Sequence, residues 1–251
     1  GADGIVLDVK TGSGALMETL PDALALAQTM VDIGKLAGKP VVAVITSMAQ
    51  PLGTHIGNAL EVKDAIDVLA GRTQGDLLEI SLLLGSHMLV LAEKVKTLPE
   101  ARAMLENALS SGAGLRKLAE MIAAQGGDPR VVEDLSLLPQ AAVKRVMRAE
   151  TAGYLSAMDT TALGMAAQRM GAGRAKKSDM LDYSVGYVLH VRLGDEVTED
   201  TLLATLYARN EAEAEEAEKA IRKALTIAKE KPQTPKLWDA VVTAEGITYN
   251  R

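Results

Sequence analysis

The chain has 251 residues, of which 48% are hydrophobic and 24% charged, and its formal net charge at pH 7 is −6. This composition is typical of a globular protein with a real hydrophobic core, and the acidic balance argues against nucleic acid as the main partner, because a phosphate-binding surface usually needs a basic excess. Cysteine is absent, which excludes disulfides, a thiol nucleophile and a thiolate metal site.

The N-terminal segment follows a strand, helix, strand pattern. Apolar runs predict buried strands over residues 5–9 and 41–45, and apolar residues at helical spacing predict a helix over 21–37. A right-handed crossover would set the two strands side by side in parallel. Loops 11–14 and 46–57 then leave the same sheet edge, where ligands gather in open α/β sheets. The candidate site residues at this edge are Asp8, Lys10, Ser13 and His55.

The glycine-rich loop is weak evidence when taken alone. Its TGSG sequence matches neither GxGxxG nor a phosphate loop with GK[ST], so on spacing alone a plain strand-to-helix turn is the favoured explanation.

The middle of the chain predicts helices. Asn58, with Glu61 three residues later, predicts the start of a helix over 59–70. Residues 76–125 read as helical with breaks near 97–99 and 111–112, followed by a short helix and a loop over 129–139. The most apolar window, 77–91, is shorter than the roughly 20 residues that a membrane span needs. We therefore expect no membrane partner and a cytoplasmic location.

The pattern changes near Val143. Alternation over 185–193 predicts a strand with one drier face, and His190 falls on its wetter face. The other elements predicted here are strands over 143–148, 154–158 and 202–207 and helices over 160–170 and 211–229, the last with Asn210 as N-cap. We expect an α/β fold whose parallel-containing sheet has flanking helices, followed by a smaller α+β module, with domains at 1–149 and 150–251.

Two local patterns are weighed against structural explanations. The three histidines form no metal or catalytic motif, and His87, in the middle of a helix, reads as structural. The stretch GYVLHVRLGDEVTEDTLLATLYA resembles half of a biotinyl or lipoyl carrier. A carrier would present a lysine at a hairpin tip, whereas Arg209 and Asn210 lie where this chain enters a helix, so a sandwich-like structural module is favoured.

Five stretches together point to a known family: DVKTGSGALM, TSMAQPLGTHIGNALEVKDA, LLLGSHMLVLAEK, AAQGGDPRVVEDLSLLP and ALGMAAQRMGAGRAKKSDMLDYSVGYVLHVRLGD. In this order, over nearly the whole chain, they resemble the pyrimidine nucleoside phosphorylases, including thymidine phosphorylase. The resemblance implies homo-oligomeric enzymes that split uridine or thymidine with inorganic phosphate, giving free base and pentose 1-phosphate. It implies phosphate as co-substrate and no other required cofactor.

The same resemblance implies that this chain has no catalytic residue of its own. The family's phosphate-binding motif, of the KHSTGGVGD kind, and the arginine, serine and lysine that hold the pyrimidine do not occur here. The chain therefore corresponds to the C-terminal two-thirds of the family pattern. The total lack of phenylalanine and a start without methionine, almost inside a strand, also favour a fragment or an engineered sequence.

Four site residues follow from the resemblance. Leu16 stands where the family's GAFM motif has a base-lining phenylalanine, so the pocket shape is in doubt. Leu52 and His55, through backbone carbonyls, and Asp64, where the family has glutamate, match positions that hold a potassium or calcium ion. For Asp64 the alternative is an exposed first-turn acid favoured by the helix dipole.

Two functions remain open at this point. The chain is part of a nucleoside phosphorylase, inactive alone, whose partners are a nucleoside and phosphate once the other segments are supplied. Alternatively, it is a non-catalytic fragment or a simplified scaffold, free of phenylalanine and cysteine.

Overall fold

The computed structural model describes residues 1–250. It contains two compact units, each described by itself: unit 1 comprises Gly1–Ala49, Ala70–Gly114 and the residues from Pro235 onward, and unit 2 comprises Gln50–Leu69 and Leu115–Thr234. The predicted boundary at residue 150 falls inside unit 2. None of the helices formed by residues 1–250 combines the length and the apolar character that crossing a membrane requires.

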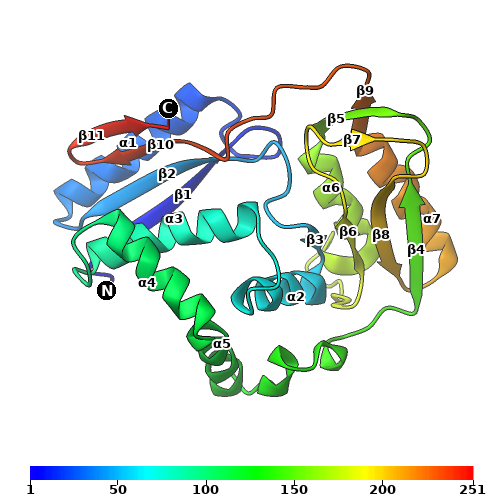
Figure 1. The fold of residues 1–251 in the computed structure, drawn as a ribbon, viewed down its shortest axis with the longest axis horizontal. Coiled ribbons are helices and arrows are strands. Elements are labelled where there is room, and N and C mark those ends of the chain that lie inside the picture. Colours follow the sequence, from blue (N-terminus) through cyan, green and yellow to red (C-terminus); the bar gives the residue numbers. More distant parts are fainter. Residues whose placement is uncertain (251) are drawn as a thin grey trace. The chain divides into compact units, whose positions relative to one another are not determined.

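Unit 1 contains a four-stranded sheet in the order β1-β2-β10-β11. The predicted parallel pair is confirmed, because β1 (Ile5–Thr11) pairs in parallel with β2 (Val41–Ser47). The sequence analysis missed β10 (Trp238–Thr243), which pairs antiparallel with the other edge of β2, and β11 (Gly246–Tyr249), which completes a hairpin. Residues from both ends of the chain therefore build one sheet (Figure 1).

Helices cover both faces of this sheet. Helix α1 (Leu20–Leu36), with Thr19 as its N-cap, packs Ala23, Ala27 and Val31 against inward side chains of β1, β2 and β10. The opposite face, with Val42 and Val44, packs against leucines of α3 (Asp76–Leu91). The predicted helix breaks are also confirmed, because α4 (Leu98–Ser110) and α5 (Ala113–Ala124) follow as separate helices.

Unit 2 is built on two antiparallel sheets, and its strand β3 is followed by helix α2 (Asn58–Leu69). The first sheet has the order β3-β6-β8-β4: β3 (His55–Ile56), β6 (Gly186–Leu189), β8 (Leu202–Ala208) and β4 (Val143–Arg148). The second has the order β7-β5-β9: β7 (Glu196–Val197), β5 (Gly153–Met158) and β9 (Leu225–Ala228).

The core of unit 2 lies between these sheets and two helices, α6 (Thr160–Ala167), extended by η3 (Gln168–Ala172), and α7 (Glu211–Ala224). Its largest fully buried side chain is Tyr187, whose hydroxyl donates to the carbonyl of Leu163 at 2.8 Å. The 3₁₀ helices η1 (Pro129–Val132) and η2 (Leu135–Leu137) precede β4.

Two predicted elements of unit 2 are wrong in extent. The helix predicted to run to residue 229 ends at Ala224, because the following LTIA segment, with β-branched Thr226 and Ile227, forms β9 and pairs with β5. The strand predicted over 185–193 is confined to β6, and it is buried on both faces, with Val188 only 8% exposed. A strand covered on both sides loses the wet face that simple alternation predicts.

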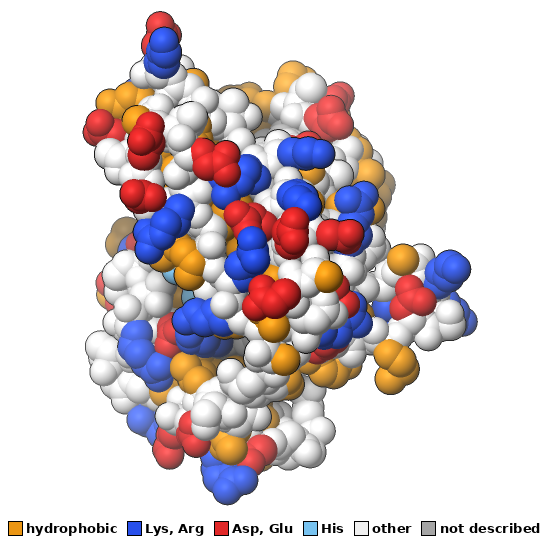
Figure 2. All heavy atoms as spheres, turned by 90° about the vertical axis from the view of Figure 1, so that its right-hand side faces the viewer, with side chains coloured by type: hydrophobic (Ala, Val, Ile, Leu, Met, Phe, Trp, Pro, Cys, Tyr) orange, Lys and Arg blue, Asp and Glu red, His pale blue; other side chains and the backbone are white. Residues whose placement is uncertain are grey.

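A carboxylate on α7 ties that helix to β4. Glu218 accepts from Arg145 Nε of β4 at 2.6 Å and from Arg222 Nη2 at 2.8 Å. Burial alone would raise the pKa of the Glu218 carboxyl, but the two arginines bring this pKa below its usual value. Figure 2 shows acidic and basic side chains interspersed over one face of the molecule. Ion pairs of this kind form where opposite charges are neighbours.

This ion pair predicts a pH-dependent stability. Because the folded pKa of Glu218 lies below its unfolded value of 4.5, its stabilising contribution is present above that pH and is lost as pH falls further. We expect Glu218→Gln to lower the free energy of unfolding by about 1–2 kcal/mol at pH 7, and the difference from the parent to shrink below pH 4. Urea titrations at several pH values measure both.

The neighbouring Glu216→Gln is the matched control, because Glu216 is exposed on the same helix. Its effect should stay within about 0.5 kcal/mol at every pH. An equal loss in both variants would show that the arginine contacts of Glu218 add nothing to stability.

Candidate functional site

The carboxyl ends of β1 and β2 bring together three polar side chains of unit 1. Lys10 Nζ pairs with the carboxylate of Asp8 and donates to Thr46 Oγ1 at 3.0 Å, while the Thr46 hydroxyl donates to Asp8. The parallel register sets Lys10 opposite Thr46, which explains why residues 36 positions apart meet. The sheet edge therefore presents a lysine held by a carboxylate and a hydroxyl.

The loop after β1 passes close to the loop after β2. Gly12 has φ of +109°, and a Cβ atom there would lie 3.4 Å from the backbone nitrogen of Ala49, so the turn suits glycine. Ser13 in this loop is exposed, and Leu16 is 88% exposed. Within unit 1, Leu16 is thus a solvent-facing side chain, and its role against a base stays a prediction.

Unit 2 contains a cavity of about 410 Å³ that we call the basic pocket. It is formed over the sheet of β3, β6, β8 and β4 and beside α2. Its lining residues are Thr54, His55, Lys63, Lys144, Val188, Leu189, His190, Arg192, Thr205 and Tyr207. Apart from His55, sequence reasoning did not connect these residues, because they come from elements that lie far apart in the sequence and are brought together by the fold.

His55 lies against a buried carboxylate. Its Nδ1 is 3.0 Å from Thr54 Oγ1 and 3.4 Å from Asp64 Oδ1, and the Thr54 amide donates to Asp64 Oδ2 at 3.2 Å. Asp64 is 3% exposed, so the alternative of an exposed first-turn acid is wrong. Burial raises the pKa of the Asp64 carboxyl, but the His55 ring and the backbone amides outweigh burial and lower this pKa. Asp64 is thus a carboxylate at neutral pH.

His190 is the second histidine that lines the pocket. It is exposed, as predicted for the wetter face, and its Nε2 lies 2.9 Å from Thr205 Oγ1. Although the residue as a whole is exposed, partial desolvation of its ring lowers the pKa of His190, and the nearby His55 and Lys144 lower it further. His87 of unit 1 lies inside helix α3, as predicted, and it is buried, which lowers its pKa.

Arg192 orders the loop that enters β3. Its Nη1 donates to the carbonyl of Pro51 at 2.6 Å and to that of Gly53 at 3.5 Å, and its Nη2 to that of Leu52 at 3.4 Å. Sequence reasoning did not assign this role to Arg192. An arginine and a stretch of turn residues are each visible in the sequence. They lie 140 positions apart, however, so no short window indicates that they are in contact.

These contacts bear on the cation expected at Leu52, His55 and Asp64. The Leu52 carbonyl already accepts from a guanidinium, and the Asp64 carboxylate already faces an imidazole and an amide. Within residues 1–250, no group of three or more His, Cys, Asp or Glu side chains could hold a metal. In this structure the guanidinium of Arg192 is the positive group beside the Leu52 carbonyl. The ion stays a prediction of the resemblance, and no step of the proposed reaction depends on it.

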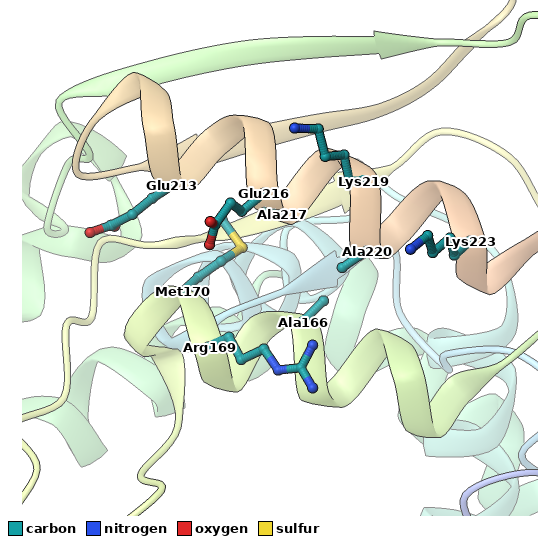
Figure 3. Close-up of a pocket in the computed structure, with 9 residues that line it drawn as sticks. All are labelled: Ala166, Arg169, Met170, Glu213, Glu216, Ala217, Lys219, Ala220 and Lys223. Carbon is teal, nitrogen blue, oxygen red and sulfur yellow. The ribbon is translucent and has the colours of Figure 1, made fainter.

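A second hollow, of about 330 Å³, lies between α6 with η3 and α7. Figure 3 shows Ala166, Ala217 and Ala220 facing the gap between the helices, with Lys219 directed away from it. The charges around this hollow have both signs, and Lys219 pairs with Glu215 at 2.6 Å. Small side chains and paired charges are typical of a helix-packing groove, so this hollow reads as structural.

Comparisons with known proteins match both parts of the chain. Residues 1–115 match a family model described as glycosyl transferase family, a/b domain, and residues 154–228 match the pyrimidine nucleoside phosphorylase C-terminal domain. The pyrimidine-nucleoside phosphorylases of Geobacillus stearothermophilus and Bacillus subtilis are each 51% identical over 211 residues, which is 84% of this chain and 49% of theirs. That of Staphylococcus aureus is 47% identical over 228 residues, 91% of this chain and 52% of its own. The chain spans about half the length of these curated relatives.

Proposed function

Because the chain belongs to the pyrimidine nucleoside phosphorylase family, we propose that it forms part of an enzyme that splits pyrimidine nucleosides with inorganic phosphate. The observation that supports this most directly is the identity of 47% or more to enzymes of that name over at least 84% of this chain. The proposed substrates are uridine or thymidine, with phosphate as the only required co-substrate.

In this reaction an oxygen of phosphate bonds to C1′ of the pentose while the C1′–N bond breaks and its electron pair leaves with the base. Rate comes from holding phosphate and nucleoside in line and from donors aimed at the departing base. We propose that unit 1 supplies the sheet edge beside which the nucleoside lies, since ligands of open α/β sheets gather at the carboxyl ends of strands. Lys10, held by Asp8 and Thr46, is the positive group at that edge.

The groups that grip phosphate and base are not assigned to this chain. Its sequence has neither a KHSTGGVGD-type motif nor the arginine, serine and lysine of the pyrimidine site. We therefore propose that this chain alone does not catalyse phosphorolysis of the nucleoside. A homo-oligomeric state and a cytoplasmic location belong to the same proposal. Self-association is supported by large apolar side chains of unit 1 that are exposed, namely Leu36 at 89%, Met88 at 53% and Met104 at 50%.

The second candidate is a non-catalytic scaffold, which the complete lack of phenylalanine favours. An assay of free base released from uridine or thymidine, with and without phosphate, separates the two. We expect the chain alone to match the protein-free blank. We expect phosphate-dependent release when a segment bearing both missing motifs is added, with the mass of the assembly measured by light scattering.

Two results would contradict the proposal in different ways. Robust phosphate-dependent release by the chain alone would show that the essential groups are present here. No release with the added segment, despite a complex of the expected mass, would favour the scaffold.

A further inference from the structure

The basic pocket of unit 2 has an unusual balance of charge. Three of its lining residues, Lys63, Lys144 and Arg192, are cations, and none is an aspartate or a glutamate, although the chain as a whole has a net charge of −6. Lys63 and Lys144 pair with no carboxylate among residues 1–250. Lys144 Nζ instead lies 5.8 Å from the centre of the Tyr207 ring. Both lysines are thus pocket-lining residues without a carboxylate partner among residues 1–250.

Two histidine rings line the same space. His190 shares a contact with the Thr205 hydroxyl through Nε2, and His55 is held through Nδ1 by Thr54 and Asp64. The other nitrogen of each ring has no partner among the described residues.

We propose that the basic pocket binds a phosphate group, either as inorganic phosphate or as a small phosphate monoester. Lysine ammonium groups act as point charges for phosphate, whereas a carboxylate is best matched by a bidentate arginine, and Arg192 is already engaged with backbone carbonyls. A volume of about 410 Å³ exceeds what phosphate alone fills. The ring of Tyr207, which is only partly buried, offers apolar surface to an organic group. This inference rests on the pocket and not on the proposed phosphorolysis.

The histidines give a direct readout. The sequence has 3 histidines. His55 and His190 line the pocket, whereas His87 is buried in unit 1 and serves as an internal reference. Proton–carbon NMR spectra of the imidazole rings are recorded at constant pH during titration with inorganic phosphate and, separately, with glycerol phosphate. Sodium chloride keeps the ionic strength constant. We expect saturable shifts of the His55 and His190 signals in at least one titration and none of His87.

Substitution of the two lysines tests the assignment. We expect the double variant Lys63→Gln, Lys144→Gln to bind at least about tenfold more weakly, because each lysine lost removes a charge-assisted bond. Lys177→Gln, at an exposed lysine outside the pocket, should bind like the parent. Circular dichroism checks that each variant is folded, and Lys144→Gln alone replaces the double variant if the latter is not.

Each outcome decides the proposal. Tighter binding of glycerol phosphate than of phosphate identifies the ligand as a monoester, and the reverse order identifies inorganic phosphate. Shifts that do not saturate, that equal those of a chloride titration, or that persist unchanged in the folded lysine variant would overturn the proposal.

Discussion

Replacing Gly186 by alanine is expected to lower the stability of unit 2 by about 3 kcal/mol or more. A Cβ atom at Gly186 would lie 2.1 Å from the carbonyl oxygen of Ile56 and 2.9 Å from Cα of Gly57, and the residue has φ of +148°. Strand β3 cannot simply move away, because Ile56 is paired with Tyr187 in the ladder between β3 and β6. Both the clash and the backbone conformation therefore oppose the substitution.

The measurement is thermal unfolding followed by circular dichroism. A loss of about 3 kcal/mol in a chain of this size corresponds to a fall in Tm of roughly 6–12 °C. Gly164→Ala is the matched control, since nothing lies within 4 Å of a Cβ atom there and the residue is inside helix α6. This control should be neutral or stabilising by up to about 1 kcal/mol. Equal Tm values for the two variants would mean that β3 and β6 do not approach as described.

Replacing Ile45 by alanine should destabilise unit 1 by about 3–4 kcal/mol, because a buried cavity replaces packed methyl groups. Ile45 is fully buried in β2, where it packs with α1 and with Ala240 and Val242 of β10. The fluorescence of Trp238, the 1 tryptophan in the sequence, follows this unit, because Trp238 begins β10. Urea titration monitored at this residue gives the free energy of unfolding.

Ile33→Ala removes the same atoms from a side chain that is 60% exposed on helix α1. We expect its effect to stay within about 0.5 kcal/mol. A similar loss for both isoleucines would contradict the packing of unit 1 around β2.

The sequence predicts the elements whose signals are local. Strands β1 and β2 are continuous apolar runs and α1 has an apolar face with a capping threonine, so each is visible in a short window. Strands β9 and β10 are not visible in this way. β9 continues directly from helix α7 and becomes a strand only because β5 lies beside it, and β10 depends on a free edge of β2 nearly 200 positions earlier.

The residues of the candidate sites also differ in whether a short stretch of the sequence indicates their position. Asp8 and Lys10 could be placed at a sheet edge because the strand-end rule needs only one strand–helix–strand unit. The alternative that Asp64 is an exposed acid is wrong, and a local signal pointed the other way. Asp64 lies four residues from Leu60 and from Val68, both buried, and this spacing places it on the buried face of the helix. Lys144 and Arg192 reach the basic pocket through pairings that no short window contains.

The place of β10 in the sheet has a consequence for biosynthesis. Every residue of unit 2 is translated before β10 leaves the ribosome, so one long edge of β2 lacks its neighbour while the 190 residues between Ser47 and Trp238 are made. During that interval the nascent N-terminal layer offers an open hydrogen-bonding edge to any extended peptide nearby. Shielding this edge in newly made chains would then raise the yield of native protein.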